Sequence, residues 1–501
     1  MSCYGSPLYS TSSCFPLVSD ALGLAQSHSP HNLSVQSDLK SPSATLHTTP
    51  PLPMQSMSDE KYPPLTHQSR IIVVGGGGTI GSSTALHLAR RGYVNVVVLD
   101  EFEIPSAQSA GFDLNKIAGG AVKEGWRGQL SGEIMKGWRE DPVFSPYYHE
   151  TGRVTGAHRF PEKIAKLRAA YDSAKADGYG KNYEWLDSGE AIVSKIPQLA
   201  KGNLKDWKGL WVPDSGWVAA KDTISSVGRE LSRLGVQMIF GPSGKFKRPV
   251  LSASGKVCVG VETADGTIHK ADRVIMACGA WTPSLIDLKG QCISKCWVLA
   301  HIQLTSEEVK SFKNIPVLYD DQLGFFIEPD EETGLLKLCN EFSGYTRILH
   351  SQTPFGTSHP QDISVPRSHA VHPTDTIPTE GLDDIKYLIS TLLPDFQDRP
   401  LVGAKMCWCT DTADAEWLFT EDPRWRGLFL TTGDSGHSFH TIPYVGSEVA
   451  DLLEGKMSAE KQKAWGWRKP TDPNGTGRGG PPPKDLTDVL GWTNGDDEEE
   501  V

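Results

Sequence analysis

Apolar residues occur along the chain in short blocks that glycine-rich or polar turns separate. The first two clear blocks are Ile71–Val74 and Val94–Leu99, both rich in β-branched residues, and the residues between them follow helical spacing. Short β-branched runs bounded by turn residues are typical of buried strands, and a 3.6-residue spacing of apolar positions is typical of a helix. The order strand, helix, strand predicts a parallel βαβ unit that begins near residue 70.

The same reasoning divides the rest of the chain into further elements. Helices are predicted at 132–139, 162–176, 222–234, 383–393 and 446–453, and strands at 236–240, 297–304, 325–328, 334–341 and from 427 into a Gly/Ser turn. Residues 257–263 and 268–277, on either side of a turn at 265–266, are predicted to form a hairpin that feeds another strand from Arg273. The Pro- and His-rich segment 351–377 has little periodicity and is predicted to be a long loop. The predicted fold class is α/β (α+β), with a Rossmann-like domain and a second domain built on an antiparallel sheet.

Three glycines follow the first predicted strand. Gly76, Gly78 and Gly81 have G-x-G-x-x-G spacing, and Asp100 stands at the end of the second strand. Such glycines allow a tight turn, a close approach of the backbone to a pyrophosphate, and close packing of the helix on the strand. An acid at the end of the second strand can accept both hydroxyls of an adenosine ribose. The spacing alone is a weak signal, but strand, glycines, helix and acid together predict a bound dinucleotide.

The composition of the 501-residue chain narrows the function further. The chain holds 49 basic and 61 acidic residues, a formal charge of −12, and no basic patch, so nucleic acid is not an expected partner. No apolar run approaches the length of a membrane span, and the N-terminus lacks the apolar core of a signal peptide. Nine cysteines, mostly inside apolar segments, indicate a reducing compartment. Cys292 and Cys296 have a spacing that metal sites use, but no second pair accompanies them, so buried thiols and no metal are predicted.

Both ends of the chain have a composition unlike a packed core. Residues 1–66 are rich in Ser, Pro, Thr and His and are predicted to be a disordered extension, and residues 469–501 are predicted to be a Pro/Gly-rich, acidic tail. Between them, the predicted domains are a discontinuous dinucleotide-binding domain at 67–120, 207–295 and 400–468 and a substrate or cap domain at 121–206 and 296–399.

The ordered motifs of the chain resemble those of FAD-dependent amine oxidases of the D-amino-acid/sarcosine oxidase superfamily. The resemblance rests on GGGGTIGSSTALHLARRGY, PSAQSAGFDLNK, CGAWT, GLLKLCNE, KMCWCTDT, GDSGHSF and the late KDL…GW, and it runs from about Arg70 to Trp492. Within the superfamily the chain resembles the fungal fructosyl amino acid oxidases, or amadoriases, and saccharopine oxidase-like proteins. This resemblance implies FAD as the cofactor, with the antiparallel sheet of the second domain over the flavin.

The resemblance also assigns roles to residues. It implies a covalent bond from Cys407 to the flavin 8α-methyl group, with Cys409 expected on the opposite face of the strand; the alternative is a pair of core thiols. Lys337 matches the lysine that sits over flavin N5 and promotes reaction with O2, Glu341 matches a residue that holds the substrate, and Lys116 is the third predicted catalytic residue. The predicted cofactor-binding residues are Gly76, Gly78, Thr79, Ile80, Gly81, Asp100, Ser106, Ser109, Ala110, Asp113, Asn115, Lys116, Gly279, Cys407, Asp434, Gly436, His437, Phe439 and His440.

Two positions depart from relatives that act on small amino acids. Those relatives usually have a basic residue where this chain has Gly119 and a lysine where it has His440. Both family residues bind a substrate carboxylate, and such a clamp relies on permanent charge and paired hydrogen bonds. Either Lys116, Arg127 or His437 takes over this role, or the substrate is not a simple α-amino acid.

The predicted activity is oxidation of a C–N bond in a secondary amine of amino-acid origin, such as a fructosyl amino acid or saccharopine. The resemblance implies hydride transfer to flavin N5, formation of an imine and reduction of O2 to hydrogen peroxide. The alternative is a biosynthetic oxidase of a larger N-alkyl amine, acting by N-demethylation or ring closure; a flavoprotein without turnover and a NAD dehydrogenase are rivals from other classes. The chain ends in Glu-Glu-Val and not in a peroxisomal tripeptide, so a cytoplasmic location is expected. For the oligomeric state, which the sequence does not encode in any motif, a monomer is the default expectation.

Overall fold

The computed structural model describes residues 62–120, 125–320, 322–341, 344–469, 477–478 and 480–495. Residues 1–61 of the predicted disordered extension, which was expected to run to residue 66, lie outside the described residues. Its last part is packed: the Tyr62 hydroxyl donates to Glu421 at 3.3 Å, and the guanidinium groups of Arg273 and Arg426 lie 3.8 and 4.3 Å from the centre of the Tyr62 ring.

A six-stranded sheet contains the predicted βαβ unit. Its strand order is β22 (Leu418–Glu421), β23 (Leu428–Thr432), β13 (Arg273–Met276), β1 (Ile71–Val74), β2 (Val96–Leu99) and β9 (Gln237–Ile239). β1 pairs in parallel with β2 and β13, so that Val74 lies opposite both Leu99 and Met276. α1 (Thr79–Arg90) connects β1 to β2. The predicted unit is therefore confirmed, although β2 begins at Val96 because Val94 is 62% exposed.

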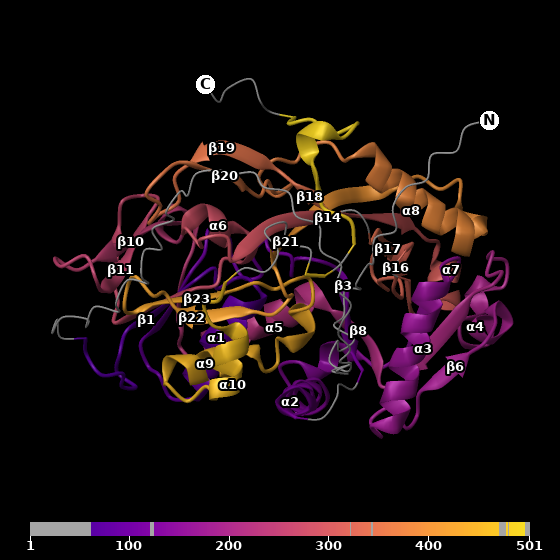
Figure 1. The fold of residues 1–501 in the computed structure, drawn as a ribbon, viewed down its shortest axis with the longest axis horizontal. Helices are drawn as coiled ribbons and strands as arrows, with labels where there is room; N and C mark the ends of the chain where they lie inside the picture. Colours follow the sequence, from indigo (N-terminus) through magenta and orange to yellow (C-terminus); the bar gives the residue numbers. More distant parts are fainter. Residues whose placement is uncertain are drawn as a thin grey trace, which may run out of the picture.

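Both faces of this sheet are buried, because β1 is apolar at every position. Ile71 and Val73 pack in one cluster with apolar residues of α1, α5 (Ala220–Arg233) and α9 (Val445–Leu453), and these three helices lie side by side below β1 in Figure 1. Ile72 and Val74 pack in a second cluster on the opposite face. That face is covered by a three-stranded sheet of β10 (Phe246–Leu251), β11 (Cys258–Thr263) and β12 (Ile268–Lys270).

A ten-stranded sheet forms the other half of the molecule. Its strand order is β24 (Lys484–Asp485), β18 (Tyr345–Thr346), β14 (Cys292–Gln303), β17 (Leu335–Cys339), β16 (Gly324–Phe326), β15 (Val317–Asp320), β5 (Arg153–Ala157), β7 (Lys208–Val212) and β6 (Glu184–Leu186), with β21 (Val402–Thr412) paired to β14. All neighbours are antiparallel except β15 with β5 and β18 with β24. The parallel and antiparallel sheets confirm the predicted fold class. β7 and β21, which the domain prediction placed in the dinucleotide-binding part, hydrogen-bond into this second sheet.

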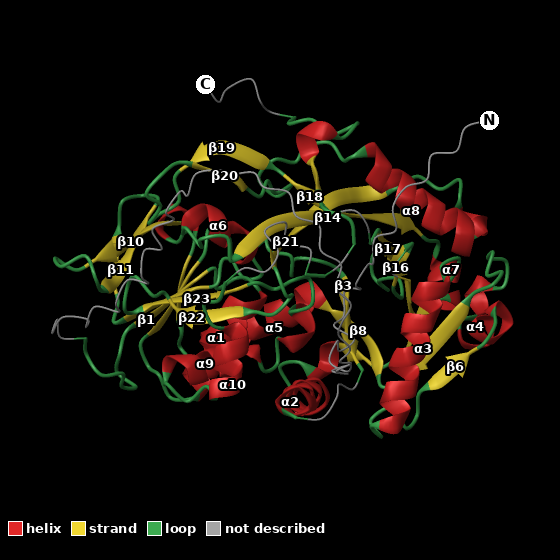
Figure 2. Cartoon of the chain, viewed as in Figure 1, coloured by secondary structure: helices red, strands yellow, loops and turns green. Residues whose placement is uncertain are grey.

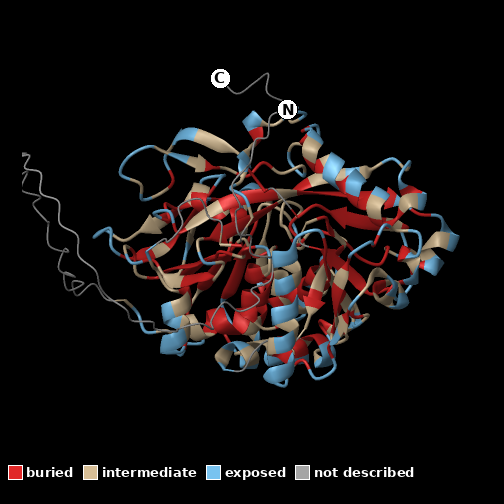
Figure 3. Cartoon of the chain, turned by 45° about the vertical axis from the view of Figure 1, so that its right-hand side comes forward, coloured by how far each residue is buried: buried red, intermediate tan, exposed pale blue. Residues whose placement is uncertain are grey.

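The remaining elements connect or cover the two large sheets (Figure 2). They are the three-stranded sheet of β3 (Asn115–Gly119), β8 (Ser215–Ala219) and β4 (Tyr148–His149), the pair β19 (Ile348–Gln352) and β20 (Gln361–Ser364), and the helices α2 (Trp126–Glu140), α3 (Pro161–Ala176), α4 (Gly189–Lys195), α6 (Thr282–Leu285), α7 (Ser306–Ser311), α8 (Thr379–Leu392) and α10 (Ala459–Trp465). Buried residues concentrate in the strands, and exposed residues lie on the outer helices and loops (Figure 3).

One of the predicted elements is wrong in part. The predicted loop 351–377 contains β20, which pairs with β19; its short, polar sequence lacks the alternation that marks a strand. The predicted hairpin of 257–263 and 268–277 is confirmed, because β12 pairs with β11, and the strand that it feeds is β13, which begins at Arg273 and pairs with β1. The predicted helix 132–139 lies within the longer α2.

The predicted C-terminal tail contributes to the core. β24 pairs with β18, and Leu486, directly after it, is fully buried in the apolar cluster of the ten-stranded sheet. The Pro and Gly content around this segment concealed its strand and its buried position. Its composition therefore predicted the wrong environment for Leu486.

The buried position of Leu486 leads to a prediction about the free energy of unfolding. Leu486→Ala should lower the free energy of unfolding by about 2–5 kcal/mol, since it removes a buried side chain and leaves a cavity. The matched control is Leu490→Ala, because Leu490 is 85% exposed in the same segment; it should change stability by less than about 0.5 kcal/mol. Urea denaturation followed by tryptophan fluorescence measures both. Equal effects of the two substitutions would contradict the docked position of the segment.

Candidate active site

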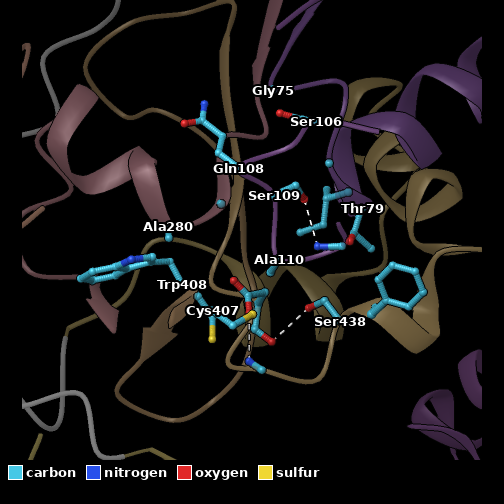
Figure 4. Close-up of a pocket in the computed structure, with 18 of the residues that line it drawn as sticks. Gly75, Thr79, Ser106, Gln108, Ser109, Ala110, Ala280, Cys407, Trp408 and Ser438 are labelled. Carbon is cyan, nitrogen blue, oxygen red and sulfur yellow. Dashed lines mark hydrogen bonds between the residues drawn. The ribbon is translucent and has the colours of Figure 1, made fainter. Parts of the chain in front are cut away.

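One cavity of about 300 Å³ lies between the two large sheets, at the carboxyl end of β1. Its walls come from the glycine loop, the 106–111 segment, β14, β17, β21 and the 434–440 segment. In Figure 4, Gly75, Ser106, Cys407 and Ser438, from four of these segments, surround the same space. A crevice beyond the carboxyl ends of parallel strands, where the strand order reverses, is the usual ligand site of an open α/β sheet.

Most predicted site residues meet at this cavity. Its lining includes Gly78, Thr79, Ile80, Asp100, Ser106, Ser109, Ala110, Lys116, Gly279, Lys337, Glu341, Cys407, Asp434, Gly436, His437, Phe439 and His440. Gly76, Gly81, Asp113 and Asn115 lie behind the lining.

The glycine loop has the close packing that its spacing predicts. A Cβ atom at Gly76 would clash with the side chain of Val98, and one at Gly81 would clash with the carbonyl oxygen of Gly75 and lie 2.8 Å from the Cα of Gly76. α1 begins at Thr79 without a capping side chain and without an acid in its first turn. Its first N–H groups therefore remain available for an anion such as a pyrophosphate.

Asp100 lies at the end of β2, as predicted, but its carboxylate already has partners. One oxygen accepts from the N–H of Gly77 at 3.0 Å, and the other accepts from the Ser106 hydroxyl at 2.8 Å and the N–H of Phe102 at 3.0 Å. Burial raises its pKa, while these donors oppose the shift. Since a carboxylate has about four acceptor positions, about one remains for a ribose hydroxyl.

One face of three adjacent strands supplies the opposite wall. In β21, Cys407 pairs with Trp297 of β14; in β17, Lys337 pairs with His301 and Cys339 pairs with Leu299, both of β14. Because side chains alternate along a strand, these residues share the cavity side of the sheet. The residues between them point the other way into an apolar cluster, which includes Val298, Ala300, Leu338 and Met406.

Cys409 also lines the cavity. The expectation that it lies on the face opposite Cys407 is wrong, because residues two apart on a strand point to the same side. Burial raises the pKa of the Cys409 thiol, and its sulfur lies 3.2 Å from a guanidinium nitrogen of Arg478. Cys407 has a different cation nearby, with the Lys116 Nζ 3.9 Å from its sulfur.

A buried carboxylate joins the two predicted catalytic lysines. The same oxygen of Asp113 lies 2.5 Å from Lys337 Nζ and 2.7 Å from Lys116 Nζ, and Lys337 also donates to the backbone carbonyl of Asn115 at 2.9 Å. Burial would raise the pKa of Asp113, but the two lysines hold it well below its ordinary value. Asp113 and Asn115 thus stand behind Lys337.

Glu341 is buried two residues beyond the end of β17 and lines the cavity. Its carboxylate accepts from the hydroxyl of Tyr319 at 3.1 Å, and its backbone carbonyl accepts from the indole N–H of Trp297 at 3.0 Å. Tyr319 and Trp297 line the cavity themselves. A carboxylate and three aromatic walls, counting Phe325, can hold a cationic or hydroxyl-bearing ligand.

Arg478, from the predicted tail, also lines the cavity and was missed by the sequence analysis. Its guanidinium pairs with Asp411 at 2.6 Å and lies 3.6 Å from the ring centre of Trp297; Lys295 pairs with the same Asp411 at 2.6 Å. Burial would raise the pKa of Asp411, but Arg478 and Lys295 hold it below its ordinary value. A lone Arg in a Gly-rich segment carries no local signal of such a position.

The structure separates the candidates for a carboxylate clamp. Gly119 has φ +88°, and a Cβ there would lie 2.7 Å from the carbonyl oxygen of Asp214, so the backbone itself excludes a basic side chain at this position. Burial lowers the pKa of His440 to about 3, and burial also lowers that of His437, so both rings are neutral near pH 7. Arg127 lies outside the cavity lining, where it pairs with Glu416.

The sequence analysis expected neither a metal site nor a membrane span, and the structure bears on these expectations only for the described residues. Cys292 and Cys296 carry unpaired thiols, and within the described part of the chain no His, Cys, Asp or Glu cluster could hold a metal ion. None of the described helices combines the length with the hydropathy that a membrane span requires.

The contact between Gly81 and the glycine loop makes a binding prediction. Gly81→Ala should weaken FAD binding at least tenfold, about 1.4 kcal/mol, because the added methyl displaces the backbone that approaches the cofactor. Gly132→Ala is the control, since nothing lies within 4 Å of a Cβ at that position in α2. The ratio of flavin to protein absorbance after purification and after dialysis measures retention. Unchanged retention in Gly81→Ala would contradict the assigned role of this glycine.

Comparison with known proteins supports the resemblance that the motifs predicted. The chain is 32% identical to the L-saccharopine oxidase of Schizosaccharomyces pombe over 415 residues, covering 80% of this chain and 94% of that protein. It is similar to the structure of fructosyl peptide oxidase from E. terrenum, with 46% identity, a TM-score of 0.82 and coverage of 86% and 99%. It is also similar to fructosamine oxidase (Amadoriase II) from Aspergillus fumigatus, with 34% identity, a TM-score of 0.74 and coverage of 86% and 98%. Residues 70–452 match the model of the DAO family of FAD dependent oxidoreductases, and the chain belongs to this family.

Proposed function

We propose that this protein is an oxidase of the C–N bond in a secondary amine of amino-acid origin, with fructosyl amino acids or peptides and saccharopine as the substrate class. The observation that carries this proposal is the meeting of Lys337, Glu341 and Cys407 at one cavity beside the glycine loop. The similarity to proteins named fructosyl peptide oxidase and L-saccharopine oxidase supports the same class.

The residues of the cavity fit FAD. The uncapped start of α1 suits a pyrophosphate, and the thiol of Cys407 stands in the wall across from the glycine loop. When bound, FAD supplies the redox chemistry, taking a hydride from the carbon next to the amine nitrogen and passing the electrons to O2, which gives an imine and hydrogen peroxide.

Lys337 provides a buried positive charge where oxygen is reduced. Its side chain is 1% exposed, and its Nζ is fixed by Asp113 and the carbonyl of Asn115. A fixed ammonium in a site of low dielectric stabilises negative charge that develops on oxygen, without the reorganisation that water would need.

Glu341 and the two cations at the cavity position the substrate. The carboxylate of Glu341, oriented by Tyr319, binds the amine or the sugar hydroxyls. Lys116 and Arg478 line the cavity and can bind a substrate carboxylate, which replaces the clamp that Gly119 and the neutral His440 do not provide. The cytoplasmic location and monomeric state belong to this proposal and rest on the sequence alone.

A substrate panel tests the activity. Purified protein should release hydrogen peroxide with fructosyl-valine, fructosyl-lysine or saccharopine, measured with a peroxidase-coupled dye. Pipecolate and sarcosine, which lack the extended second substituent on nitrogen, should give less. Peroxide from none of these compounds would overturn the substrate class and favour a larger N-alkyl amine.

We also propose that Cys407 forms a thioether to the flavin. Its sulfur lines the cavity, with Lys116 Nζ 3.9 Å away. Forming the bond would remove the thiol proton and one proton of the 8α-methyl group, and the two electrons would pass through the flavin to O2, as they do in the proposed turnover. Cys407→Ser should give a colourless pellet after acid precipitation, whereas the wild-type pellet stays yellow. Cys409→Ser is the matched control, because Cys409 lies two residues away on the same face, and its pellet should stay yellow. A yellow pellet from Cys407→Ser would place the tether at another residue.

A further inference from the structure

The carboxylate of Asp113 is shared by two lysines that come from different sheets. Lys116 belongs to β3 and Lys337 to β17, and both ammonium groups contact the same oxygen, at 2.7 and 2.5 Å. The Asp113 side chain is 2% exposed and lies behind the cavity lining. Asp113 is absent from the lining of the large cavity and lines a smaller one beside it, so it acts on the large cavity through the two lysines.

Positive charge exceeds negative charge around Lys337. The groups that face it are Asp113, Lys116 on β3, His301 on β14 and Cys339 on its own strand, and Lys405 on β21 acts on the same Asp113 carboxylate. Lys405 donates to the carbonyl of Phe112 at 2.9 Å, next to Asp113. Burial lowers the pKa of His301 and raises the pKa of the Cys339 thiol to about 12, so both are neutral near pH 7. Three ammonium groups thus compete for one carboxylate.

The two lysines differ in the direction of their pKa shifts. Burial would lower the pKa of Lys116, but Asp113 raises it above its ordinary value. Burial lowers the pKa of Lys337, which is 1% exposed, and the charge of Lys116 lowers it further, while Asp113 opposes both effects. A buried ammonium keeps its proton only when a paired charge offsets its desolvation. Asp113 raises the pKa of both lysines, but only the pKa of Lys337 ends below its ordinary value, so the protonation of Lys337 is the more sensitive to loss of this carboxylate.

We propose that Asp113 is a positioning residue that keeps Lys337 cationic near neutral pH and aims its Nζ into the cavity, with Lys116 as a competitor for the same carboxylate. The proposal rests on the proposed function, because the charge of Lys337 matters there for reaction with O2. It deepens that function by making oxygen reactivity depend on a residue outside the lining of the large cavity. Two substitutions should then act on Lys337 in opposite directions.

The charge of Lys337 can be measured without turnover. In the flavin-containing protein, trace acetylation with acetic anhydride at pH 5–11, followed by mass spectrometry of the Lys337 peptide, reports the pH at which the neutral amine forms. Asp113→Asn keeps the shape and removes the charge, so the midpoint for Lys337 should fall by about one pH unit or more. Lys116→Met removes the competitor, so the midpoint should rise. Asp113→Glu restores the charge and should return the midpoint toward that of the wild type.

The control is Asp141→Asn, which removes an acid that pairs with Arg90 on the surface, outside the cavity lining. It should leave the Lys337 midpoint unchanged. Unchanged midpoints in both Asp113→Asn and Lys116→Met, or shifts of the same sign, would overturn the proposal. Opposite shifts could not come from a general loosening of the fold, and Lys116→Met keeps the test open if Asp113→Asn does not fold.

Re-oxidation separates this proposal from the proposed function. After photoreduction, the rate of re-oxidation in air should fall as the pH rises through the Lys337 midpoint, and in Asp113→Asn this fall should occur at a pH about one unit lower or more. A shift in the acetylation midpoint with an unchanged re-oxidation profile would support the control of Lys337 by Asp113 and overturn the oxygen role of Lys337. A matching shift in both profiles supports both.

Discussion

The bridge from Asp113 to Lys337 and Lys116 determines how the cavity is built. A buried ion costs several kcal/mol unless a partner offsets its desolvation, so an acid between two lysines is stable only while all three stay in place. The contacts at 2.5 and 2.7 Å join β17 of the ten-stranded sheet to β3 of the small sheet. The same ion pairs that stabilise the junction of the two sheets therefore position the charged groups of the site.

A second bridge repeats this arrangement on the other side of the cavity. Asp411 is fully buried, with Lys295 and Arg478 each 2.6 Å away. Arg478 comes from the C-terminal segment, whose Leu486 is buried in the core of the second sheet. The segment is thus held by apolar packing at one position and by an ion pair at another. The packing of Leu486 and the ion pair with Asp411 together position the Arg478 guanidinium at the cavity.

Strand alternation explains why chemically different residues share one wall. Lys405, Cys407, Cys409 and Asp411 are spaced by two in β21, and all face the side of the sheet where the cavity and its ion pairs lie. The alternate residues of the same strands pack in an apolar cluster, which fixes the register. One strand therefore supplies two thiols, an ammonium and a carboxylate without a local change in backbone. The chain, a member of the family of FAD dependent oxidoreductases, thus divides into a sheet that carries the glycine loop and a sheet whose side chains line the cavity.

The sequence by itself determined the βαβ unit, the glycine loop and the fold class, because strand, turn and helix signals there lie within about thirty residues of one another. Most of the site residues that its motifs predicted, including Lys337 and Cys407, line the cavity. Only the tertiary structure decided that Asp113 and Lys337 form an ion pair, since 224 residues separate them. It also decided that Arg478 lines the cavity, although the composition of its segment resembles that of a linker. It also excluded a side chain at Gly119 and made His440 neutral, through the backbone of Asp214 and through burial. Spacing along a chain encodes the periodicity of an element, whereas strand pairing, desolvation and charge sharing depend on which distant residues meet.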